Sequence, residues 1–148
     1  MSKIQKEISV RGKDHQELLA VLKEAQDRYG YLSGDHIREL ASALGLPVSE
    51  VYGVATFYSF LSTKPQGRHV IRICKSVPCF LKSSDTIIES IKKELGIEPG
   101  ETTADGRFSF ELVNCIGACD KAPAMMIDHD VHGELDQDKI AQILQGYE

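Results

Sequence analysis

The sequence contains no tryptophan, and no apolar run comes near the roughly 18–20 residues that a membrane-spanning helix needs. Its first residues, MSKIQKEISVRGKDHQELL, lack the hydrophobic stretch of a signal peptide. These absences predict a protein that is made and kept in a reducing compartment, and we expect a cytoplasmic location. Neighbouring cysteines in such a compartment serve metal binding or redox chemistry more often than structural disulfides.

The sequence also lacks the common motifs of nucleotide and hydrolytic sites. It has no G-x-G-x-x-G loop, no Walker A loop, no nucleophile elbow and no H-E-x-x-H pair. We therefore expect no catalytic residue and no nucleotide-binding residue in this chain. Any hydride or flavin chemistry would have to lie on another chain.

Positive charge is scarce in the second half of the chain. Residues 1–66 carry eight basic and eight acidic side chains, whereas residues 67–148 carry nine and fourteen and so account for the whole net charge of -5. This balance argues against a nucleic-acid partner, which needs a basic surface. The acidic residues near the C-terminus form either a solvated face or a docking patch for a partner: Asp120, Asp128, Asp130, Glu134, Asp136 and Asp138.

Apolar residues make up 42% of the chain, which is enough for a packed core, and in the first third they recur at helical spacing. One helix is predicted to begin at a capping box of Asp14 and Glu17 and to end at Gly30. A second runs between Ser33 and Gly45, and a third follows directly. The stretch STKPQGRH then breaks the pattern. We expect an N-terminal three-helix bundle in residues 1–66 and a second domain in residues 67–148.

The second part alternates strands and helices. HVIRIC is β-branched and predicts a strand, and SSDTIIESIKKELG predicts an amphipathic helix. In RFSFELVNC the period of two places Phe108, Phe110 and Leu112 on one face. A hairpin from PAMMIDHD and VHGEL and a closing helix complete an α+β layer fold.

Only four cysteines are present, in two tight pairs, CKSVPC and CIGAC. The pattern predicts Cys74 at the end of the first strand and Cys79 in the loop before a helix. It predicts Cys115 at the end of the second long strand and Cys119 in the loop that follows. If the two strands are neighbours, both pairs meet at one rim of the sheet, where loops usually carry function.

Thiolates are soft ligands that suit both zinc and iron–sulfur clusters, so ligand type alone does not separate the two. Structural zinc sites favour C-x2-C turns, whereas the spacings here are C-x4-C and C-x3-C. The small residues of CIGAC allow backbone N–H groups to approach bridging sulfides. A zinc-stapled interaction module without a redox role and a dithiol oxidoreductase stay as alternatives. His129 and His132 are expected to be ordinary surface or strand residues, because the cysteines already supply four ligands.

The runs CKSVPC, PGETTADGRF, GACDKAP and EVYGVATFY together resemble the thioredoxin-like [2Fe–2S] subunit of the NADH-oxidising module of respiratory complex I. The same family occurs in soluble NAD-linked hydrogenases, formate dehydrogenases and electron-bifurcating complexes. The resemblance covers roughly residues 14–146.

The resemblance implies a helical bundle followed by a thioredoxin-like [2Fe–2S] ferredoxin domain. It implies an electron-transfer subunit that performs no catalysis alone, with a [2Fe–2S] cluster held by Cys74, Cys79, Cys115 and Cys119. The implied partner is a flavoprotein subunit that binds FMN and NAD(H) and carries its own iron–sulfur cluster. Further electron-carrier subunits are implied, and any attachment to a membrane would be indirect, through a complex. The loop from Lys75 to Pro78 departs from the family, because many members have a glycine or small polar residue there.

Overall fold

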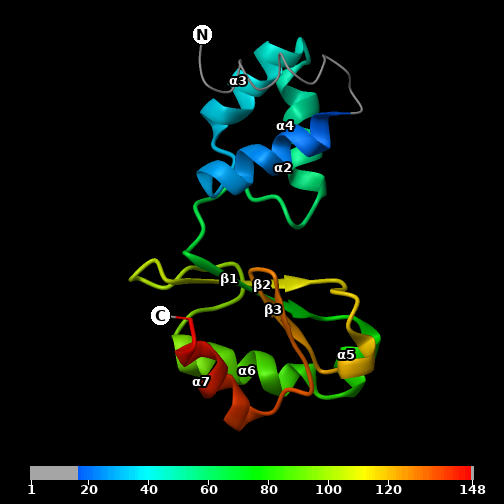
Figure 1. The fold of residues 1–148 in the computed structure, drawn as a ribbon, viewed down its shortest axis with the longest axis vertical. Helices are drawn as coiled ribbons and strands as arrows, with labels where there is room; N and C mark the ends of the chain where they lie inside the picture. Colours follow the sequence, from blue (N-terminus) through cyan, green and yellow to red (C-terminus); the bar gives the residue numbers. More distant parts are fainter. Residues whose placement is uncertain (1–16, 148) are drawn as a thin grey trace. The chain divides into compact units, whose positions relative to one another are not determined.

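The computed structural model describes residues 17–147. The chain divides between Pro65 and Gln66 into two compact units, which are described separately below. Among residues 17–147, none of the helices combines the length and hydrophobicity of a membrane span. The described part of the first unit is helical, and the second unit combines helices with a sheet (Figure 1).

The described part of the first unit contains helices α2 (Leu18–Tyr29), α3 (Gly34–Leu44) and α4 (Val48–Phe57). Gly30 and Gly45 end the first two helices in the left-handed conformation, as predicted. The Ser33 side chain accepts a hydrogen bond from the backbone of His36 and begins α3. The predicted capping residue Asp14 lies outside the described residues, and Glu17 makes no side-chain cap.

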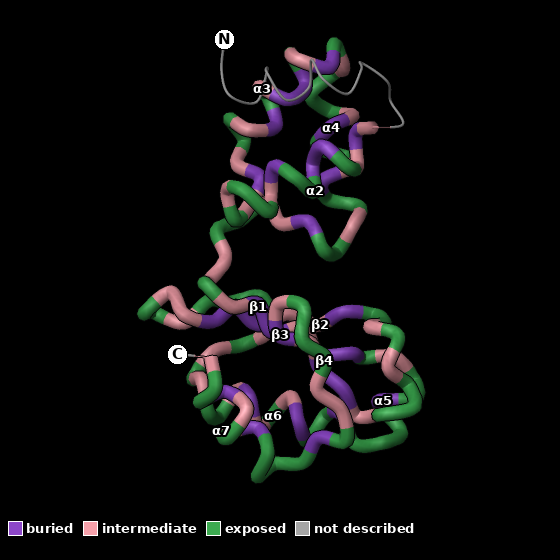
Figure 2. Tube along the Cα trace, in the orientation of Figure 1, coloured by how far each residue is buried: buried purple, intermediate pink, exposed green. Residues whose placement is uncertain are grey.

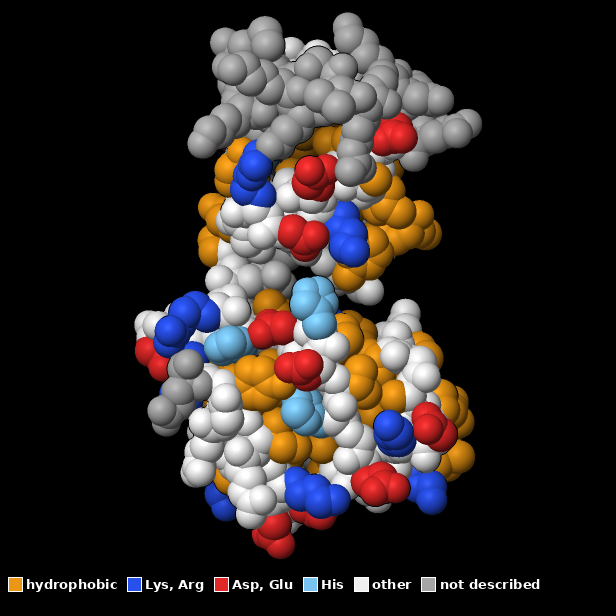
Figure 3. Space-filling model, in the orientation of Figure 1, with side chains coloured by type: hydrophobic (Ala, Val, Ile, Leu, Met, Phe, Trp, Pro, Cys, Tyr) orange, Lys and Arg blue, Asp and Glu red, His pale blue; other side chains and the backbone are white. Residues whose placement is uncertain are grey.

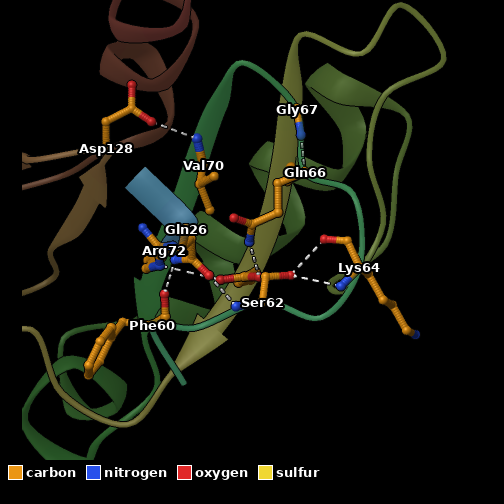
Figure 4. Close-up of polar contacts among 11 residues, drawn as sticks. Gln26, Phe60, Ser62, Lys64, Gln66, Gly67, Val70, Arg72 and Asp128 are labelled. Atoms are coloured by element: carbon orange, nitrogen blue, oxygen red, sulfur yellow. Dashed lines mark hydrogen bonds and ion pairs between the residues drawn. The ribbon is translucent and has the colours of Figure 1, made fainter. Parts of the chain in front are cut away.

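Apolar side chains from all three of these helices share one buried core. The buried positions along the helices are coloured purple in Figure 2. The segment after α4 is tied to α2 through Gln26. Its amide donates to the carbonyl oxygen of Phe60 at 2.6 Å, and its oxygen accepts from the backbone of Ser62 (Figure 4). The first unit therefore has its own core and its own internal polar contacts.

The second unit is built on a four-stranded mixed sheet in the order β2-β1-β3-β4. β1 (His69–Cys74) pairs in parallel with β2 (Phe108–Val113) and antiparallel with β3 (Met125–Ile127). β3 and β4 (Asp130–His132) form the predicted hairpin. Together with the helices, this sheet has the α+β composition expected of a thioredoxin-like domain.

Helices α6 (Ser84–Leu95) and α7 (Gln137–Gln145) lie on one side of the sheet (Figure 1). Their apolar faces and the facing strand residues make the core of this unit, with these members buried: Ile71, Ile73, Ile87, Ile91, Phe108, Phe110, Met125, Ile127, Leu135, Ile140 and Leu144. The crossover from β1 to β2 covers this face, as parallel strands require.

The predicted alternation along β2 holds only in part. Phe108 and Phe110 are buried, but Leu112 is only partly so. Ser109, on the opposite face, is also buried, and its hydroxyl accepts from the backbone of Gly67 at 2.7 Å and contacts the Thr102 hydroxyl at 2.6 Å. The start of β2 is thus covered on both faces, which a period of two does not reveal.

Candidate metal centre

The parallel pairing of β1 and β2 brings the two cysteine pairs to the same edge of the sheet. Cys74, the last residue of β1, lies opposite Val113, the last residue of β2. The next backbone N–H, that of Lys75, donates to the carbonyl oxygen of Val113 at 2.9 Å. Cys115 follows two residues after Val113. Because parallel strands end on the same side, both loops that carry cysteines leave the sheet together.

The first loop differs from the prediction, because Cys79 lies on a short helix. Helix α5 (Val77–Leu81) begins after Ser76, whose backbone is extended, and Pro78 occupies its first turn. Proline has a fixed φ suited to a helix start, and it favours a helix where the sequence predicted a loop. Cys119 likewise begins a 3-10 turn, η2 (Cys119–Lys121), within the loop where it was expected.

The two cysteine pairs differ in their exposure. Cys74 and Cys79 are each only 1% exposed, whereas Cys115 and Cys119 lie at the surface. The buried pair belongs to a strand and a helix, which fix its backbone. The exposed pair lies after β2, with Cys115 in an irregular segment and Cys119 at the start of η2.

Polar groups gather around the sulfur atoms. The Ser76 hydroxyl lies 3.0 Å from Sγ of Cys74, and the thiol of Cys74 lies 3.6 Å from the carbonyl oxygen of Asn114. In the second loop the backbone N–H of Gly117 donates to Sγ of Cys115 at 3.3 Å. Gly117 has a positive φ of 78°, a conformation that costs other residues energy. Its presence therefore lets the loop turn its N–H toward sulfur.

The thiols influence one another's ionisation. Burial raises the pKa of Cys74, but hydrogen bonds led by that of the Ser76 hydroxyl outweigh it, so the pKa lies below the ordinary value. Burial raises the pKa of Cys79, and the neighbouring Cys74 and Cys119 raise it further. Loss of hydration and the nearby Cys115 raise the pKa of Cys119. Thiols from both loops are therefore close enough to feel each other's charge.

Comparison with known proteins agrees with this geometry. The family model described as "Thioredoxin-like [2Fe-2S] ferredoxin" matches residues 4–148. The chain belongs to this family. The membership confirms the family resemblance drawn from the sequence, and it confirms the [2Fe–2S] cluster as the predicted cofactor.

Named relatives are subunits of an oxidoreductase and of hydrogenases. A subunit of the NADH-quinone oxidoreductase of Pseudomonas aeruginosa is 45% identical over 129 residues, which are 87% of this chain and 78% of the relative. The NADP-reducing hydrogenase subunit HndA of Solidesulfovibrio fructosivorans is 35% identical over 130 residues, or 88% of this chain and 76% of the relative. Among solved structures, an NAD⁺-reducing [NiFe]-hydrogenase in the air-oxidised state aligns with a TM-score of 0.76 and 29% identity. That alignment covers 87% of this chain but only 22% of the hydrogenase chain.

The donor set of this ferredoxin suits the family's cofactor. Four free thiols stand in two pairs, and four thiolates that sense one another's charge repel unless a cation lies among them. Within residues 17–147, no three His, Cys, Asp or Glu side chains are gathered about a point that could hold a single metal ion. A [2Fe–2S] cluster asks for two thiolates at each iron, so the paired arrangement is compatible with it.

Two further residues shape the site and carry only weak sequence signals. Ser76 contacts the sulfur of Cys74, but a serine between two cysteines is not distinctive. Gly133 has no room for a side chain, because a Cβ atom would lie 2.8 Å from the carbonyl oxygen of Lys121 and closer still to its Cβ. Gly133 thus allows the segment after β4 to pack against η2. Only a structure reveals this contact, since the two residues lie 12 positions apart in the chain.

Several of the histidines and acidic residues near the C-terminus have structural partners. Asp128 accepts from the backbone of Val70 at 2.9 Å (Figure 4) and from the ring of His69 at 2.7 Å. Tyr147 donates to Asp130 at 3.0 Å and lies 2.9 Å from Nε2 of His132. Asp136 caps α7 through the backbone of Lys139, which lowers the Asp136 pKa. In Figure 3 histidine and acidic side chains lie side by side on the second unit. His132 lies in β4, and His129 lies in the turn between β3 and β4.

Proposed function

We propose that Cys74, Cys79, Cys115 and Cys119 are the four ligands of the [2Fe–2S] cluster. The observation that carries this proposal is the shared edge of β1 and β2, from which both cysteine pairs emerge. The chain has no other cysteine, and all four are free thiols. The cluster supplies one-electron redox chemistry, and the protein supplies position, hydrogen bonds and shelter from water.

The chain would serve as an electron-transfer subunit of a multi-subunit NAD(P)H-linked oxidoreductase, without catalysis of its own. The names of its relatives support this assignment. Its expected partner is a flavoprotein subunit that binds FMN and NAD(H), followed by further electron carriers. Complex I, a soluble hydrogenase, a formate dehydrogenase and a bifurcating transhydrogenase all agree with the family.

A surface suited to such a partner lies beside the buried cysteines. Helix α5 exposes Val77, Phe80 and Leu81 by 68, 56 and 75%, although Cys79 on the same helix is buried. Exposed apolar side chains that adjoin one another mark protein interaction sites more often than single exposed ones do. Docking here would exclude water from the sulfur atoms and bring the partner's electron carrier near them.

We also propose that residues 1–66 are a three-helix bundle and residues 67–148 a separate cluster-binding domain. Each unit has its own buried core, and no residue belongs to both. Limited proteolysis should cut first between residues 63 and 68 and leave a C-terminal fragment that keeps the cluster.

Metal and sulfide analysis tests the cofactor and the ligand set. Anaerobically purified protein should be reddish-brown and contain about two iron ions and two acid-labile sulfides per chain. One zinc ion and no sulfide would instead favour the zinc-stapled module. Affinity purification from the native host should recover an FMN-containing chain, whose absence would contradict the partner assignment.

A further inference from the structure

Ser76 holds its hydroxyl in an unusual place for a residue that starts a helix. It occupies the N-cap position of α5, yet its side chain caps no backbone N–H. The hydroxyl lies instead 3.0 Å from Sγ of Cys74, in a part-buried position. An N-cap serine ordinarily accepts from the backbone two or three residues ahead. The contact to sulfur therefore replaces the usual one.

Pro78 explains in part why the Ser76 hydroxyl contacts sulfur and does not cap the helix. It is the second residue of α5 and has no N–H, so one of the two usual capping donors is missing. The Ser76 carbonyl is engaged in the helix, because it accepts from the backbone of Phe80 at 3.0 Å. The backbone of Ser76 is thus held while its hydroxyl is free to face Cys74.

The direction of the hydrogen bond follows from the chemistry of a metal ligand. A free Cys74 thiol can donate its proton, and the Asn114 carbonyl lies 3.6 Å from the sulfur. A thiolate bound to iron has no proton to donate, so between the two side chains only the Ser76 hydroxyl remains as a donor. Because the position is part-buried, water competes less for this bond.

We propose that Ser76 is a positioning residue that stabilises the reduced, more negative form of the cluster by donating a hydrogen bond to the Cys74 sulfur. A hydrogen bond to an acceptor becomes stronger as the acceptor gains negative charge. Adding one electron to the cluster increases the charge on its sulfur ligands, so this bond raises the reduction potential. The inference rests on the proposed role of Cys74 as a ligand.

A redox titration of Ser76→Ala, followed by electron paramagnetic resonance, tests the proposal. The midpoint potential should fall, by an amount corresponding to about a tenfold smaller equilibrium constant for reduction, or about 59 mV for one electron. Ser76→Thr keeps a hydroxyl at the same position and should restore a potential near that of the unaltered protein. Ser90→Ala removes a hydroxyl that donates to the Thr86 carbonyl within α6, and it should leave the potential unchanged.

Every outcome of these measurements either supports or overturns the proposed role of the Ser76 hydroxyl. An unchanged or higher potential in Ser76→Ala, with full iron and sulfide content, would overturn the proposal. If Ser76→Ala binds no cluster, then binding by Ser76→Thr supports the hydroxyl contact, whereas failure of both variants indicates a purely structural role and overturns it. Failure of the proposed ligand role of Cys74 is distinguishable, since Cys74→Ser would then keep the full cluster spectrum whatever the potential of Ser76→Ala.

Discussion

The second unit has two polar regions that are built in opposite ways. At one, the cysteine end, the four cysteines lie at or after the ends of β1 and β2, and polar groups of Ser76 and Gly117 contact two of the sulfur atoms. At the other, the histidine end, the polar side chains satisfy one another: His69, Asp128, Asp130, His132 and Tyr147. Both ends contain residue types that bind metals, but the histidine end uses them to hold the fold together.

This difference shows that residue type alone is a weaker guide to a metal site than the hydrogen bonds that each side chain already makes. Asp128 holds the start of β1 through the Val70 backbone and the His69 ring. Both oxygens of this carboxylate are thus engaged in holding the start of β1. Among the cysteine sulfurs, that of Cys115 instead accepts from the Gly117 backbone, and that of Cys74 lies 3.0 Å from the Ser76 hydroxyl. Polar contacts of this kind tune a thiolate that binds metal.

The largest effect is expected from replacing cysteines at the cysteine end. Cys79→Ser and Cys119→Ser should each lose most of the visible spectrum of the cluster, because loss of a ligand should cost more affinity than the roughly 10–100-fold lost with the outer contacts of a metal site. The two should differ once iron is removed. Cys79→Ser buries a hydroxyl and should lower the unfolding free energy of the iron-free protein by about 1–3 kcal/mol, whereas the exposed Cys119→Ser should change it by less than about 0.5 kcal/mol.

Absorption spectra and urea denaturation of the iron-free proteins measure both quantities. A full-strength spectrum from Cys119→Ser would show that the ligand assignment is wrong. Equal destabilisation by both substitutions would show that the exposed loop is as tightly packed as the strand and helix.

An intermediate effect on stability and cluster content is expected where η2 packs against the segment after β4. Gly133→Ala places a Cβ against Lys121, and overpacking of this kind costs about 1–3 kcal/mol. The displaced η2 carries Cys119, so cluster content should fall with stability. Gly53→Ala is the matched control, because its Cβ meets nothing within 4 Å and α4 should gain up to about 1 kcal/mol. Unchanged cluster content in Gly133→Ala would mean that η2 tolerates the shift.

Local patterns predicted much of this architecture. Gly30, Ser33 and Gly45 mark helix ends because backbone conformation and capping are properties of single residues and their neighbours. The strand HVIRIC, and the position of Cys74 at its end on one edge of the sheet, also follow from the sequence. The helix at Cys79 was missed although Pro78 is a local signal for a helix start. The burial of Ser109 could not be predicted, because it depends on covering residues distant in sequence.

The smallest effect is expected at the histidine end, where Tyr147→Phe removes one hydroxyl. Burial and the hydrogen bond to Asp130 raise the pKa of Tyr147 from 10.0 to about 12. The folded-state pKa is raised, so this stabilisation is complete below pH 10.0 and is lost as the pH rises through about 12. Tyr147→Phe should therefore lower the unfolding free energy at neutral pH by only about 0.5–1 kcal/mol, because the hydroxyl is partly exposed. It should also remove the latest step from a spectrophotometric titration of the five tyrosines. The cluster spectrum should stay the same, and a changed spectrum would show that the two ends are coupled through the sheet.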